Sequence, residues 1–102
     1  MEFSPQIVPE LQTHTQKYLV QQGFAFQVSG SVSQDNSIDL TLRDPQSTPS
    51  KGVVLRLTEE FLRFSDPHRV HEVLEQQAHY FAKQGLHEME PEGFPVIVIG
   101  AT

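Results

Sequence analysis

The sequence predicts an α+β fold, a two-layer sandwich in which both helices cover one face of a mainly antiparallel four-stranded sheet. Apolar residues first recur at helical spacing, then alternate along the chain as in strands. A second helical stripe and a short apolar segment follow. The element order is therefore α-β-β-β-α-β. A chain of 102 residues has the length of one domain, so we expect 1–102 to fold as a unit.

The first helix is predicted over residues 9–22, where apolar side chains recur on one face. Pro9 suits the first turn, because the backbone N–H that proline lacks has no partner there. Gly23 is well placed to end the helix in the left-handed conformation. Residues 1–8 also contain Pro5, and we expect them to form an irregular arm.

Three strands are predicted next. Residues 24–32 and 38–43 alternate apolar and polar side chains around a polar turn, which indicates a hairpin with one face in water. Gly30 interrupts the first strand and predicts a bulge or bend. Residues 53–57 form the third strand, and the segment 44–52 reads as a mobile connection.

A short helical turn is predicted at 58–64, with a short strand as the alternative. The second long helix starts at Asp66-Pro67 and ends at Gly85. The last strand, 94–99, is apolar on both faces. Six residues are expected in the core: Leu19, Phe26, Leu40, Leu55, Leu74 and Phe81.

Composition and charge exclude several classes of function. Asp plus Glu outnumber Lys plus Arg by 13 to 7, for a net charge of −6, which disfavours nucleic-acid and anionic-membrane partners. Cysteine is absent, so a disulfide framework or a thiolate metal site is excluded. The sequence has no secretory signal pattern and no long apolar run, so we expect a cytoplasmic protein.

No motif for a serine nucleophile or a phosphate cradle is present, and we expect neither catalytic residues nor a cofactor. One histidine row stands out. His71, Glu75 and His79 are spaced i, i+4 and i+8 on the second long helix, with His68 nearby. Imidazole and carboxylate one turn apart can share a divalent ion. The row is expected on the solvent face without further ligands, so we predict no bound metal.

Two known families have an element order similar to this one. Double-stranded-RNA-binding domains share the order α-β-β-β-α, but they need lysines where the segment 66–72 has one arginine and two acids. In order and charge the chain resembles the small acidic dimeric chaperones of bacterial secretion systems. Those place a long helix before a three-stranded meander, then a second helix and further strands. Here one strand follows the second helix, so the last part of that fold has no counterpart.

The last strand carries more apolar surface than a one-sided sheet needs. We therefore predict an interface at Val96, Ile97, Val98 and Ile99, filled by a second copy packing face to face or edge to edge. The alternative cover is the N-terminal arm with Phe3. The homodimer is favoured, because the arm is short and interrupted by proline.

The function predicted is a small acidic, non-enzymatic protein-interaction module, regulatory or chaperone-like, that binds itself and possibly another protein. The alternative is a small enzyme or ligand-binding subunit. Its cleft would lie between loop 44–52, the segment Phe61-Leu62-Phe64 and the histidines of the second long helix.

Overall fold

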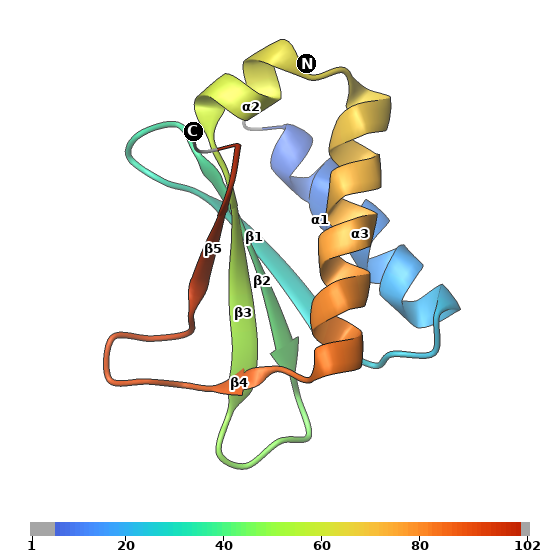
Figure 1. Ribbon diagram of the computed structural model, residues 1–102, viewed down its shortest axis with the longest axis vertical. Coiled ribbons are helices and arrows are strands. Elements are labelled where there is room, and N and C mark those ends of the chain that lie inside the picture. The colour runs from blue at the N-terminus through green and yellow to red at the C-terminus, as the bar shows by residue number, and fades with distance from the viewer. Residues whose placement is uncertain (1–5, 101–102) are drawn as a thin grey trace.

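The chain folds as an α+β sandwich, which confirms the predicted class. The computed structural model describes residues 6–100, and both long helices lie on the same side of the sheet (Figure 1). Among these residues no helix has the length and apolar character needed to cross a bilayer. The elements are α1 (Ile7–Gln21), β1 (Gln27–Val32), β2 (Ile38–Asp44), β3 (Lys51–Leu57), α2 (Glu59–Phe64), α3 (Pro67–Gln84), β4 (His87–Glu88) and β5 (Val96–Ile99).

The strand β3 lies at the centre of the sheet. It pairs antiparallel with β2, which pairs antiparallel with β1. Its other edge is shared by β4, antiparallel at Lys51 and Gly52, and by β5, parallel at 54–57. The two-residue β4 was not predicted from the sequence. β5 runs parallel to β3 because α2 and α3 carry the chain back to the end of the sheet where β3 starts.

Helix α1 begins at Ile7, so the predicted irregular arm is too long at its C-terminal end. Pro9 is the third residue of the helix, still within the first turn, where its missing N–H costs no hydrogen bond. Gly23 follows the helix with a φ of +87°, the left-handed conformation that the sequence predicts for this position.

The polar residues before α2 and α3 cap these helices. The Thr58 hydroxyl accepts a hydrogen bond from the Phe61 N–H at 3.1 Å, and α2 forms as predicted at 58–64. The Asp66 carboxylate accepts one from the Arg69 N–H at 2.8 Å, with Pro67 at the first helical position.

The core lies between the sheet and the two long helices. Five of the six residues predicted for it are buried; Phe26 is wrong, because it is only half-buried. β1 starts at Gln27, three residues after the start of the predicted strand, so Phe24 and Phe26 precede it. Their rings stack with centroids 5.7 Å apart at the margin of the core. The five buried residues are Leu19, Leu40, Leu55, Leu74 and Phe81.

Gly30 introduces no bulge in β1, which was one of the two irregularities predicted for it from the sequence. It stays in register opposite Leu40, and β1 pairs with β2 along its whole length. A Cβ atom at Gly30 would lie 2.7 Å from Cγ1 of Val8. The glycine is therefore needed for close approach of α1 to the sheet, which is the other common role of a glycine within a strand.

Candidate functional site

Three side chains of α1 face three side chains of α3 in matching steps of four residues. Glu10 lies opposite His71, His14 opposite Glu75, and Tyr18 opposite His79. Residues four apart lie on one face of a helix, and each pair is separated by the same 61 positions. The helices therefore run side by side in the same direction, joined by what we call the polar ladder, the six residues of these pairs.

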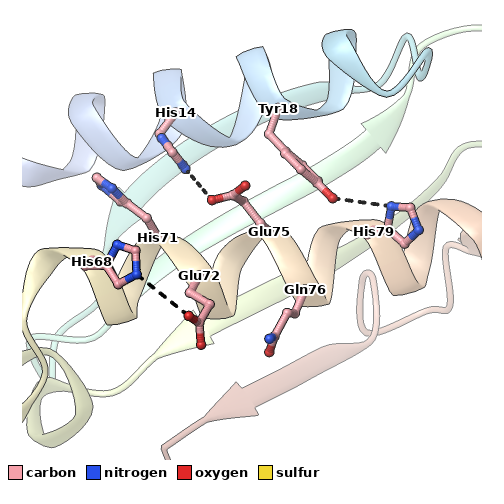
Figure 2. A pocket seen from close by; sticks show the side chains of 8 residues that line it. All are labelled: His14, Tyr18, His68, His71, Glu72, Glu75, Gln76 and His79. Carbon is pink, nitrogen blue, oxygen red and sulfur yellow. Dashed lines mark hydrogen bonds and ion pairs between the residues drawn. The ribbon is translucent and has the colours of Figure 1, made fainter.

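The three pairs of the polar ladder differ in the distance between their polar atoms. The Nε2 of His14 lies 3.2 Å from a Glu75 carboxylate oxygen, and the Tyr18 hydroxyl lies 3.3 Å from Nδ1 of His79. Figure 2 shows both contacts spanning the space between α1 and α3. The third is longer, with 4.0 Å between Nε2 of His71 and Glu10.

The rings of His14 and His71 stack on each other across the two helices. Their centroids are 4.0 Å apart and their planes differ by 14°. Nε2 of His71 is buried and has no hydrogen-bond partner within residues 6–100. Burial first, and then the neighbouring His14, lower the pKa of His71 below its ordinary value of 6.5. The neutral form of this imidazole is therefore favoured in the folded chain.

Two hollows flank this stack. The larger, which we call the groove, has a volume of about 570 Å³, and the smaller about 500 Å³. Both are lined by His14 and His71, so the stacked rings stand between them. The groove contains four of the five histidines of the chain, and its lining consists of His14, Tyr18, His68, His71, Glu72, Glu75, Gln76 and His79 (Figure 2).

The row of His71, Glu75 and His79 does not lie on the solvent face that the sequence predicts. All three are half-buried, because α3 packs against α1 as well as against the sheet. The α1 side of the groove was not predicted from the sequence; it consists of His14 and Tyr18. The sequence feature that could have identified it is the four-residue spacing of Glu10, His14 and Tyr18, which matches the spacing of the row on α3.

The cleft proposed for the enzyme alternative is not assembled as predicted. The groove is lined by α1 and α3 only, so neither loop 44–52 nor the segment 61–64 contributes to it. No arginine belongs to its lining among the described residues. The groove thus offers imidazoles, carboxylates and a phenol, and lacks the fixed cation of an anion site.

The chemistry available in the groove is proton exchange. An imidazole side chain can gain or lose a proton, and three of these imidazoles lie within 4.0 Å of a carboxylate. Within residues 6–100 no three ligand side chains converge in a way that would hold a metal ion. The absence of a bound metal at His71, Glu75 and His79 stays a prediction.

The opposite face of the sheet, which we call the open face, is not covered by either long helix (Figure 1). Two rows of paired residues cross it. One row contains Ser29, Thr41, Val54 and Val96, and the next contains Ser31, Asp39, Arg56 and Val98. The open face is therefore polar on β1 and β2 and apolar at Val54, Val96 and Val98, with the charged Arg56 of β3 beside Val98.

The four predicted interface residues divide between the two faces. Ile97 and Ile99 pair with Leu55 and Leu57 on the helix side, and they pack against the core. Val96 and Val98 point to the open face and are 42% and 46% exposed. Only these two are available to a partner. The alternative cover, the arm with Phe3, lies outside the described residues.

Charged groups border the apolar half of the open face. Arg56 donates two hydrogen bonds to the Asp39 carboxylate, at 2.8 and 3.1 Å, and this contact raises the pKa of Arg56. Arg43 donates to the amide oxygen of Gln27 at 2.8 Å and has no carboxylate partner within residues 6–100. The Phe94 ring lies close to Gly52, where a Cβ would approach it to 3.0 Å.

Comparison with known proteins returned no matching family model, no matching curated protein and no matching solved structure. Any indication of function therefore comes from the groove and the open face of this chain.

Proposed function

We propose that this chain is a protein-interaction module that forms a homodimer through the open face of its sheet. The observation that carries the proposal is the exposure of Val96 and Val98 beside the half-buried Val54. These three valines are adjacent on β3 and β5. Covering them with a second apolar surface would remove their exposed area from water, at about 25 cal/mol per Å².

The composition of the open face supports an interface. Interfaces combine a desolvated apolar centre with a polar rim. Here the centre is the valine cluster, with the aromatic ring of Phe94 near it. The rim holds Arg43 at one end and the Asp39–Arg56 ion pair at the other.

The charges of this face are complementary to a second copy of the same face. Along β2, Asp39 and Arg43 both point to the open face with Thr41 midway between them. We consider a two-fold axis that lies between the two stacked sheets, parallel to the row that contains Thr41, Val54 and Val96. This axis makes the strands of the partner run in the opposite direction. It would place Arg43 over Asp39 of the partner subunit and each valine cluster over the other. Such a contact is isologous, with the same patch used on both subunits.

The absence of a nucleic-acid partner belongs to the same proposal, supported by the acidic composition. Ligand binding in the groove is the second candidate function. It is favoured by the convergence of four histidines on one hollow of about 570 Å³. Proteins commonly bind small ligands in concave sites of this size.

Light scattering coupled to size exclusion tests the dimer. We expect the unmodified chain at tens of micromolar to have twice the 11.5 kDa mass of the monomer. Val96→Asp should restore the monomer mass, because dimerisation would bury its carboxylate without a partner. The matched control is Val20→Asp on α1, where the valine is 61% exposed, and this variant should remain dimeric. A monomer mass for the unmodified chain would refute the dimer.

A further inference from the structure

The stack of His14 and His71 separates the two hollows between α1 and α3. Both hollows are open to solvent and are lined by both rings, so moving the rings apart would join the hollows into one continuous surface groove along the helix pair. The stack therefore occupies the position of a gate.

We propose that the His14–His71 stack is a proton-operated gate, closed while His71 is neutral and opened when His71 gains a proton. The two rings stack with their centroids 4.0 Å apart. A proton on His71 would place a positive charge in a stack that is partly shielded from water, where burial and the neighbouring His14 both disfavour the charged ring. The charged ring is therefore more stable outside the stack than within it.

The groups around His71 determine how readily its ring is protonated. Glu10 and Glu75 attract a proton to the ring, whereas His14, His68 and the loss of solvent oppose it. Glu10 is 4.0 Å away and its side chain is 59% exposed, so water weakens its attraction. Glu75 is already in contact with His14. The charged and titratable groups facing His71 are Glu10, His14 and Lys17 from α1, and His68 and Glu75 from α3.

The closed gate also leaves a polar atom without a partner. Nε2 of His71 is buried and unbonded within the described residues, which carries a cost in free energy. Rotating the protonated ring out of the stack would expose that nitrogen to water or bring it to Glu10. Opening thus moves the charged ring out of the stack and satisfies the nitrogen in one movement.

The remaining contacts of α1 keep the fold intact when the gate opens. Leu11, Thr15 and Leu19 of this helix are fully buried, and Val8 packs against Gly30. The movement is therefore expected at the side chains and on the groove side of α1, without loss of the sheet. This separates the gate from global unfolding.

Nuclear magnetic resonance of the histidine rings tests the gate in the unmodified chain. Stacked rings shift each other's proton resonances, so opening should remove this mutual shift from His14 at the same midpoint at which His71 titrates. That midpoint should lie below the ordinary value near 6.5. Persistence of the mutual shift after His71 has titrated would overturn the proposal.

Amide hydrogen exchange provides the second measurement. Between pH 7.5 and pH 5, after correction for intrinsic rates, exchange on the groove side of α1 should accelerate relative to β2 and β3. The gain should be about tenfold for each pH unit between the His71 pKa in the closed and open states. His71→Gln should abolish the acceleration, and the control His87→Gln, at an exposed histidine of β4, should keep it. Equal acceleration in His71→Gln would also overturn the gate.

Discussion

The polar ladder and the open face lie on opposite sides of the molecule and differ in how their side chains are satisfied. On the ladder, His14 contacts Glu75 and Tyr18 contacts His79, so half-buried polar groups find partners within the chain. On the open face, Val96 and Val98 remain exposed without apolar cover from residues 6–100. Unpaired polar groups are costly to bury and apolar groups are costly to expose. Apart from Nε2 of His71, the polar groups of these pairs are satisfied within the chain, whereas the exposed valines of the open face are the basis of the proposed dimer.

The largest effect should be the difference between substitutions on the two faces of β5. Ile97→Asp would place a carboxylate against the core, and we expect an unfolded or grossly destabilised chain. Val98→Asp, one residue away on the open face, should yield a folded monomer. Circular dichroism with light scattering distinguishes the two outcomes. Equal damage from both variants would show that Val98 serves the fold of the single chain.

The next effect concerns the core between the two surfaces. Leu74 is fully buried on α3, and Leu74→Ala should lower the free energy of unfolding by about 2–5 kcal/mol through lost burial and a cavity. The matched control is Gln76→Ala, at an exposed position of the groove on the same helix. It should change stability by less than about 0.5 kcal/mol. Urea unfolding measures both, and comparable losses would contradict the face assigned to Leu74.

Much of the fold follows from local patterns in the sequence. The capping residues Thr58 and Asp66 and the stop at Gly23 predict helix ends because each acts on its own neighbours. The alternation in 38–42 and 53–57 predicts the buried face of the sheet correctly. Gly30 was misinterpreted because its role depends on Val8, which lies far away in the sequence.

The site was less predictable because it depends on which helices become neighbours. The row of His71, Glu75 and His79 is visible in the sequence, but its burial requires α1 to pack alongside α3. The same limitation applies to β5. Its apolar character is evident, whereas the side that each residue faces depends on its parallel register with β3.

The smallest predicted effect is a pH dependence of the free energy of unfolding, which we expect from His71 of the polar ladder. His71 has a lowered pKa in the folded chain, so below about pH 6.5 the unfolded chain binds more protons at this residue. Its contribution to stability is present above that pH and is lost as the pH falls through the folded-state pKa. His71→Gln should therefore flatten the decline in unfolding free energy between pH 6.5 and 5, whereas His87→Gln should not. Identical slopes in all three proteins would contradict this assignment.

The distance between two copies of Ser29 tests the central claim most directly. The chain has no cysteine, so Ser29→Cys can carry a single nitroxide label. Ser29 lies on β1 in the row of the proposed two-fold axis, and face-to-face packing would bring the two β1 strands to roughly 10 Å. Edge-to-edge pairing of the β5 strands would separate them by seven strand spacings, roughly 34 Å.

Electron paramagnetic resonance of the labelled protein reads this distance. We predict strong short-range dipolar broadening that disappears on dilution with unlabelled chain, and no such broadening for Lys83→Cys at an exposed position on α3. A separation near that of edge-to-edge pairing would contradict the face-to-face contact while leaving a dimer in place. The absence of any dipolar coupling at tens of micromolar would contradict the homodimer itself.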